Sequence, residues 1–286
     1  MYKQEITGKH RTAFIFAVDR SLSMSERVVC EWGHTLTKAD MVAQAVNDML
    51  SELEKRALRE GCVRNYFDIA VLGYWDGKVV PLIDPKRPFI PISELRNYEP
   101  RRYDRVVEHC DRNGCRVVTE ESADAWIDPV ASGSTPMYEA FWEIGRLVSG
   151  WCANPLNAES FPPVVINITD GEASDCDPVE LRNESLNIRR QGTADGNVLL
   201  MNVHITTSTC GGSLLFPTDD EVGHENLYSR LLADCSSVMP SVFNGIVRDM
   251  RRDEAEPPYL AMGYNTSPKD LFAMLNIGSR SVTGIR

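Results

Sequence analysis

In the sequence AFIFAVDRSLSMS, Ala13–Ser25, an apolar run ends at an aspartate that is followed by serines at alternate positions. A short, wholly apolar run such as Ala13–Val18 is typical of a strand buried on both faces of a parallel sheet. In sheets of this kind, ligands bind just outside the carboxyl ends of the strands. Asp19, Ser21 and Ser23 therefore fall where a binding site is expected.

Beyond this stretch, strand and helix patterns alternate along the chain. Further strands are expected within 66–83, where Asp76-Gly77 makes a turn, and within 162–171, 197–207 and 259–265. Helices are expected after a capping box at Thr37–Asp40, within 133–151 with Pro136 in the first turn, after Asp177-Pro178, within 225–238, and from Ser267 to Leu275. The alternation predicts an α/β fold with a doubly wound, mostly parallel central sheet and helices on both faces.

One region, at about 84–131, breaks the alternation, because it holds prolines and little helical periodicity. We expect one domain over 1–286 with this region as an insertion. Two RVV runs within it flank Asn113-Gly114, which predicts an inserted β-hairpin. A metal site at His109, Cys110 and Cys115 is the alternative, but no second cysteine pair completes it. Between Ser25 and the capping box, a long polar loop is expected.

The composition narrows the class of function. The 286 residues carry a formal net charge of −11, which argues against broad nucleic-acid binding and against docking on anionic membranes. The first residues are polar and resemble no signal peptide, and the apolar run at 13–18 is too short to span a bilayer. The 8 cysteines are scattered, as expected of reduced thiols. These features predict a cytoplasmic protein with no nucleic-acid or membrane partner.

Small oxygen-bearing side chains gather at the predicted carboxyl edge of the sheet. Thr135 stands in a loop that enters a helix, and Asp170 follows the strand VVINIT. The candidate metal ligands are Asp19, Ser21, Ser23, Thr135 and Asp170. Carboxylate and hydroxyl oxygens suit a hard cation such as Mg²⁺, with Mn²⁺ as an alternative. The competing interpretation is that Asp19 caps a turn and the serines cap the next helix.

These motifs carry a resemblance to a known family. D-x-S-x-S after the first strand, GST before a helix and TDG after a central strand, in this order, resemble the von Willebrand factor A (vWA) domain. The resemblance implies a complete metal-ion-dependent adhesion site, with hydroxyl ligands at Ser21, Ser23 and Thr135. It places the carboxylates at Asp19 and Asp170, which in this family often act through water.

The C-terminal LFAMLNIGSRSV is similar to stand-alone bacterial vWA proteins of the tellurium-resistance type. The resemblance implies a non-enzymatic interaction module in a bacterial signalling, stress or chaperone-like assembly. Its Mg²⁺ is expected to bind an Asp or Glu of a protein partner. A kinase, a metal-dependent phosphatase and an AAA+ ATPase are the partner classes that the resemblance suggests.

Two other functions stay open. A metal-dependent hydrolase such as a phosphoesterase could use the same carboxylates, with Asp19, Asp170 or Glu172 as general base. A haloacid-dehalogenase-like phosphatase is disfavoured, because its second acid would stand where Ser21 is. A structural subunit that binds no metal is the third possibility.

Aromatic and imidazole side chains are mostly expected in the core. His204 lies in an apolar strand and is expected to be a core histidine. Tryptophan side chains are also core candidates, with one exception. Trp32 follows the serine motif and is a candidate interface anchor, although core burial is the commoner role.

Overall fold

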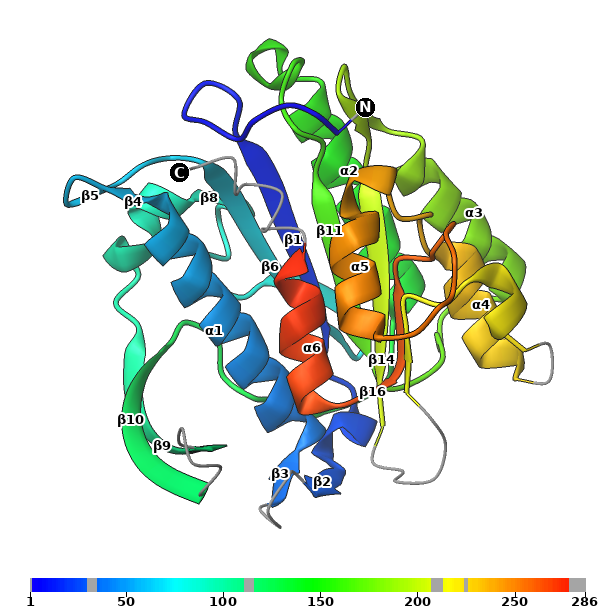
Figure 1. Cartoon of the computed structure of the whole chain (residues 1–286), viewed down its shortest axis with the longest axis horizontal. Helices are drawn as coiled ribbons and strands as arrows, with labels where there is room; N and C mark the ends of the chain where they lie inside the picture. Colours follow the sequence, from blue (N-terminus) through cyan, green and yellow to red (C-terminus); the bar gives the residue numbers. More distant parts are fainter. Residues whose placement is uncertain (1, 30–34, 111–115, 207–212, 224–225, 278–286) are drawn as a thin grey trace.

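The computed structural model describes residues 2–29, 35–110, 116–206, 213–223 and 226–277, and its centre is an eight-stranded sheet (Figure 1). The parallel strands are β1 (Thr12–Asp19), β6 (Phe67–Trp75), β11 (Val164–Thr169), β14 (Leu199–Ile205) and β16 (Met262–Thr266). The antiparallel strands are β7 (Lys78–Pro81), β8 (Ile90–Pro91) and β15 (Leu214–Leu215). The strand order is β15-β16-β14-β11-β1-β6-β7, with β8 paired to β6.

Helices cover both faces of this sheet, which confirms the predicted α/β fold class (Figure 1). One face carries α1 (Lys38–Ala57), α5 (Asn244–Arg251) and α6 (Pro268–Leu275). The other face carries α2 (Met137–Cys152), α3 (Pro178–Arg189) and α4 (Leu227–Cys235). Among the helices in the described part of the chain, none has both the length and the apolar character needed to cross a membrane.

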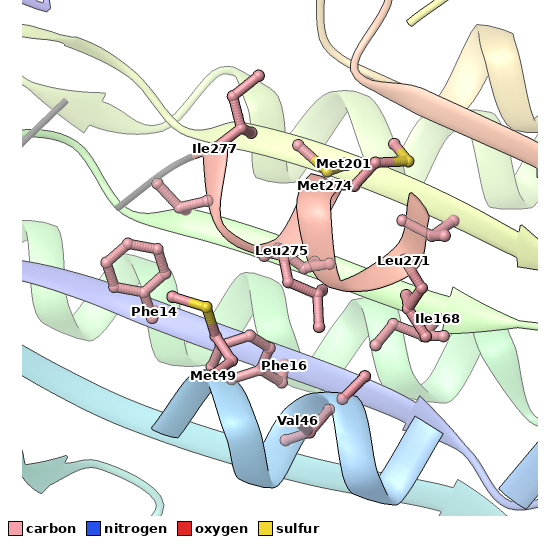
Figure 2. Packing of buried hydrophobic residues seen from close by; sticks show 14 of the residues in the cluster. Phe14, Phe16, Val46, Met49, Ile168, Met201, Leu271, Met274, Leu275 and Ile277 are labelled. Atoms are coloured by element: carbon pink, nitrogen blue, oxygen red, sulfur yellow. The ribbon is translucent and has the colours of Figure 1, made fainter. Parts of the chain in front are cut away.

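Strand β1 supplies the core on both faces, because successive side chains of a strand point to opposite sides. Phe14 and Phe16 pack in the cluster that includes α1 and α6, whereas Ile15 and Ala17 pack in the cluster that includes α2. Figure 2 shows Phe16 from β1 in the layer between α1 and α6. All eight residues of β1 are buried, Asp19 included. The predicted doubly buried strand is therefore confirmed.

Local signals mark most helix ends where the sequence predicts them. The Thr37 side chain accepts from the backbone N–H of Asp40, and the Asp40 side chain accepts from Thr37, so the predicted capping box precedes α1. Asp177 caps α3 in the same way with Glu180. Helix α2 begins at Met137, with Pro136 at the N-cap rather than in the first turn. At the turn between β6 and β7, Asp76 and Gly77 have positive φ angles of 48° and 67°, as a tight hairpin requires.

Several segments differ from or extend the prediction. The expected long loop after Ser25 contains β2 (Arg27–Val29) and β3 (Thr35–Thr37), which pair antiparallel. The hydrogen bonds of such a pair join backbone groups, so they can form in a polar stretch as well. The sequence does not predict α5, because its apolar side chains are only Ile246, Val247 and Met250, a stripe too short to stand out in a stretch of eight residues. The described chain also contains β4 (Leu58–Arg59), β5 (Cys62–Val63), β12 (Gly192–Thr193), β13 (Gly196–Asn197), and the 3₁₀ turns η1 (Leu22–Ser25), η3 (Ile92–Asn97), η4 (Pro155–Asn157), η5 (Asp219–Glu221) and η6 (Ser241–Phe243).

The inserted region forms the expected hairpin strands. β9 (Arg101–Cys110) and β10 (Arg116–Ala125) pair antiparallel in a two-stranded sheet of their own, alongside α1 (Figure 1). The predicted turn at Asn113-Gly114 lies outside the described residues. Arg105 ties the hairpin to α1 through two hydrogen bonds of 2.7 and 2.8 Å to the Asp48 carboxylate. The assignment of 1–286 to one domain stays a prediction.

Candidate metal centre

The candidate site lies where the winding of the sheet reverses. From β1 the chain passes through α1 to β6 on one side, and it later returns through α2 to β11 on the other side of β1. In open α/β sheets, a ligand crevice forms at this switch point. The parallel register pairs Val18 with Ile168, so the ends of β1 and β11 lie side by side. Asp19 and Asp170 therefore meet at one edge of the sheet, as predicted.

Asp19 is a buried carboxylate held by two donors. Its Oδ1 accepts a hydrogen bond of 2.8 Å from the backbone N–H of Ser21, and its Oδ2 accepts one of 2.8 Å from the Thr169 hydroxyl. The residue is only 1% exposed. Burial raises the pKa of Asp19 to about 6; hydrogen bonds from Ser21 and Thr169 act against this, and the nearby charge of Asp170 adds to it. An acid of this kind gains from a nearby cation.

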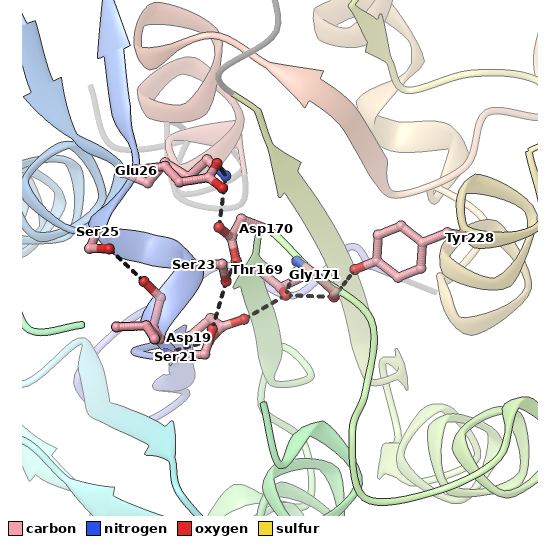
Figure 3. Close-up of polar contacts among 11 residues, drawn as sticks. Asp19, Ser21, Ser23, Ser25, Glu26, Thr169, Asp170, Gly171 and Tyr228 are labelled. Atoms are coloured by element: carbon pink, nitrogen blue, oxygen red, sulfur yellow. Dashed lines mark hydrogen bonds and ion pairs between the residues drawn. The ribbon is translucent and has the colours of Figure 1, made fainter. Parts of the chain in front are cut away.

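The backbone N–H of Ser21 and the hydroxyl groups of Ser21 and Ser23 link Asp19 to the second carboxylate (Figure 3). The Oγ atoms of Ser21 and Ser23 are 3.1 Å apart, and the Ser23 hydroxyl donates to Asp170 Oδ1 over 2.7 Å. The structure thus brings Asp19, Ser21, Ser23 and Asp170 into one hydrogen-bonded network, in which Ser23 and Asp170 are 147 positions apart in the sequence.

The fifth predicted ligand, Thr135, is placed at the same edge by its backbone. The loop before it is bonded to the loop after β1, because Gly133 O accepts from the backbone N–H of Leu22 over 3.0 Å. Ser174 holds Thr135 from the other side: its Oγ accepts from Thr135 N, and its N–H donates to Thr135 O. Thr135 is 8% exposed. No hydrogen bond within the described residues joins its hydroxyl to the other four candidates.

Gly133, in the loop before Thr135, lies close against the turn between β6 and β7. Gly133 has φ +66°, and a Cβ added there would lie 2.5 Å from Asp76 Cβ. We expect Gly133→Ala to lower the free energy of unfolding by about 2 kcal/mol, because left-handed backbone is strained for alanine and the neighbouring side chain obstructs it. Urea unfolding measures this. Gly150→Ala in α2, where a Cβ meets nothing within 4 Å, is the control and is expected to be neutral or stabilising. Equal stability of both variants would contradict the prediction.

Lys38 is the site residue that the sequence interpretation missed. Its Nζ donates to Asp170 Oδ2 over 2.8 Å and to Glu26 Oε2 over 2.8 Å. Burial lowers the pKa of Lys38, but hydrogen bonds and charges from Asp170 and Glu26 outweigh burial and raise the pKa. The ammonium group is therefore charged. One signal was present in the sequence: a lysine in the first turn of a helix opposes the helix dipole and needs an acidic partner.

Aromatic side chains close the site on the side of β14 and α4. The Tyr228 hydroxyl donates to the backbone carbonyl of Gly171, directly after Asp170 (Figure 3). His204 is 8% exposed, stacks on Tyr264 with ring centroids 4.5 Å apart, and accepts at Nδ1 from the backbone N–H of Asn265. Burial lowers the pKa of His204 to about 4, so the ring is neutral at pH 7. The expectation of a buried histidine is confirmed, although the ring lies close to the site.

The five candidate ligands all offer oxygen atoms, from carboxylate or hydroxyl groups. Within the described part of the chain, no three His, Cys, Asp or Glu side chains form a group that could hold a metal ion. A cation bound here would rely on Asp19 and Asp170 together with hydroxyl and water oxygens, which is the chemistry that Mg²⁺ prefers. Trp32 lies outside the described residues.

Comparisons with known proteins add the following. No protein-family model and no curated protein matches the sequence. Among solved structures, the chain is similar to a von Willebrand factor type A protein from Catenulispora acidiphila, with 11% identity, a TM-score of 0.40, and coverage of 69% of this chain but only 34% of that one. It is also similar to the vWF domain of a type V pili tip protein from Porphyromonas gingivalis, with 10% identity, a TM-score of 0.44, and coverage of 97% of both chains.

A third similar structure is an uncharacterized membrane spanning protein from Vibrio fischeri, with 14% identity, a TM-score of 0.29, and coverage of 68% of this chain and 71% of that one. All three TM-scores are below 0.5, so the fold assignment rests on the strand order and connections of the chain itself. The similarity to the tellurium-resistance type stays a prediction.

Proposed function

We propose that this chain is a metal-dependent protein-interaction module. Mg²⁺, or alternatively Mn²⁺, is held by Asp19, Ser21, Ser23, Thr135 and Asp170. When bound, the metal supplies a positive charge and an open coordination position, to which an Asp or Glu carboxylate of a partner protein can bind. The protein's own side chains do the rest: they fix the oxygen atoms in place and keep the carboxylates out of bulk water.

One observation carries this proposal. Two carboxylates from adjacent strand ends are joined through Ser21 and Ser23 by hydrogen bonds of 2.7–3.1 Å, at the switch point of the sheet. Two acids so close together repel each other when ionised, and a divalent cation relieves that repulsion. Purely structural caps have no need of a second carboxylate. The competing view, in which Asp19 and the serines only cap a turn, leaves the ion pair with Lys38 as the sole role of Asp170.

The surface beside the site can supply the rest of an interface. A stable protein interface normally buries about 1,000 Å² or more, which a single coordinated carboxylate cannot provide. Leu22, between the two serines, is 62% exposed, and Val29 in β2 is 63% exposed. Exposed apolar side chains next to a charged site fit a partner that presents an acidic residue within an apolar surface.

The partner classes follow from the sequence resemblance alone. A kinase, a metal-dependent phosphatase or an AAA+ ATPase of a bacterial signalling, stress or chaperone-like assembly is proposed, with the complex forming in the cytoplasm. The acidic net charge of −11 makes nucleic acid and anionic membrane poor partners.

The geometry favours binding over hydrolysis. A general base must be able to reach the water molecule whose proton it takes. Asp19 is only 1% exposed. The Asp170 side chain is 0% exposed. Glu172 is exposed and is the remaining acid through which a phosphoesterase could work.

Affinity capture from native bacterial lysate tests the proposal. The wild-type chain in Mg²⁺ is expected to retain a specific partner, and EDTA is expected to release it, because the coordination position disappears with the metal. Glu159→Gln in Mg²⁺ is a control: this exposed carboxylate precedes β11, at the edge of the sheet opposite Asp170. Identical partners with Mg²⁺ and with EDTA would contradict the proposal, and EDTA-sensitive turnover of a phosphoester would favour the hydrolase instead.

A further inference from the structure

Lys38 connects two acidic side chains of very different exposure. Its own side chain is 6% exposed, and that of Asp170 is 0% exposed, whereas the Glu26 side chain is 56% exposed. Lys38 is the first residue of α1, so its backbone is fixed by the Thr37 cap while its long side chain reaches across to the end of β11. The ammonium group thus bridges the buried acid and the surface acid.

Both oxygens of Asp170 are engaged in this arrangement. Oδ1 accepts from Ser23, and Oδ2 accepts from Lys38. A hydroxyl such as that of Ser23 can rotate and offer a lone pair to a metal. An ammonium group cannot, because it has donors only. A second cation at Asp170 therefore meets a positive charge that is already in place, and at short range in a poorly solvated site such repulsion is strong.

We propose that Lys38 is a built-in competitor of the metal for Asp170, which keeps the affinity of the site for divalent cations weaker than its oxygen ligands alone would give. This inference rests on the proposed metal-binding function and concerns how that function is set. In this proposal Lys38 does not bind the metal; it holds Asp170 in position and lowers the affinity of the site for divalent cations.

Glu26 can keep the Lys38 ammonium group paired when a metal ion binds Asp170. The Lys38–Glu26 contact is as short as the Lys38–Asp170 contact, at 2.8 Å each. On metal binding, Lys38 gives up one acceptor and keeps the other, so its charge is never left buried without a partner. A buried, unpaired charge would be far more costly than one lost hydrogen bond.

The test is a titration of the purified chain with MgCl₂ by isothermal calorimetry, together with the Mg²⁺-induced change in unfolding temperature. Lys38→Met removes the charge and keeps much of the length. We expect its dissociation constant for Mg²⁺ to fall on the order of 10- to 100-fold, the size of effect that partners of metal ligands commonly have. The rise in unfolding temperature on adding Mg²⁺ is expected to be larger than in the wild type, because tighter binding stabilises the folded state more.

A matched control lies on the same helix. Lys55 is exposed near the other end of α1, about 25 Å away along the helix axis. Lys55→Met changes the net charge by the same amount as Lys38→Met. Its distance from the candidate site exceeds the screening length at 0.1 M salt, so we expect this variant to bind Mg²⁺ with wild-type affinity. Lys38→Gln is the second neutral variant, and it retains an N–H donor for Asp170 if Lys38→Met folds poorly without metal.

The outcomes separate the two proposals. If the wild type binds Mg²⁺ and both Lys38 variants bind it with the same or weaker affinity, the inference about Lys38 is overturned. The proposed metal site is not affected by that result. No Mg²⁺ or Mn²⁺ binding by the wild type or by any variant overturns the proposed function, and the inference about Lys38 with it. Tighter binding in the Lys38 variants together with unchanged Lys55→Met supports both.

Discussion

Asp170→Asn is expected to weaken Mg²⁺ binding by about 100-fold or more while the protein stays folded. Asparagine has the same shape, and its amide oxygen can still accept from Lys38, so the hydrogen-bonded network at the end of β11 is largely kept. The negative charge is lost, and with it one of the two carboxylates on which a hard cation depends. Isothermal calorimetry with MgCl₂ measures the change directly.

Two controls separate the loss of a metal ligand from a loss of charge elsewhere and from a loss of folding. Glu159→Gln removes one carboxylate from the segment before β11, at the opposite edge of the sheet from Asp170, and is expected to bind Mg²⁺ like the wild type. A cooperative thermal transition of Asp170→Asn shows that the loss of binding is not a loss of folding. An unchanged dissociation constant for Asp170→Asn would rule out Asp170 as a ligand, and the metal centre would have to be abandoned in its present form.

Phe16→Ala is expected to lower the free energy of unfolding by about 3–5 kcal/mol. Phe16 is fully buried in β1, in the core layer between α1 and α6 (Figure 2), and its ring stacks near that of Phe14 with centroids 6.4 Å apart. Truncation removes the burial of the ring and leaves a cavity that the central strand cannot close by moving, since β1 is paired on both sides. Urea unfolding followed by circular dichroism measures the loss.

A surface leucine is the matched control for this prediction. Leu156 is 72% exposed in η4, and Leu156→Ala is expected to change stability by less than about 0.5 kcal/mol. A loss of less than about 1 kcal/mol for Phe16→Ala would mean that the layer between β1 and the helices is not closely packed.

The sequence predicted those parts of the fold that depend on near neighbours in the chain. The strand at Ala13–Val18 could be identified because every residue in it is apolar, and it is buried throughout as β1. Helix α1 could be placed because the Thr37–Asp40 box caps it within four residues. Asp19 and Asp170 could be placed at one edge because both follow strands of the same parallel sheet.

Features with weak local patterns were missed or misjudged. The sequence predicts a loop where β2 pairs with β3, because strands of three residues are too short to show an alternation of apolar and polar side chains. Trp142 was counted among core candidates, yet it is 52% exposed on α2, whereas Trp126 and Trp151 are buried as expected. Residue type alone does not determine which side of a helix faces the core; that depends on how the helix lies on the sheet.

By itself, the sequence determined the α/β order of the elements, the central buried strand and the edge at which the oxygen-bearing side chains gather. The tertiary structure was needed to show which of those side chains are in contact and that the charged Lys38 side chain lies among them. Lys38 and Asp170 are 132 positions apart, and Thr169 and Asp19 are 150 apart. Contacts over such separations have no local pattern, because they are set by the packing of α1 and β11 around β1 and not by any short stretch of chain.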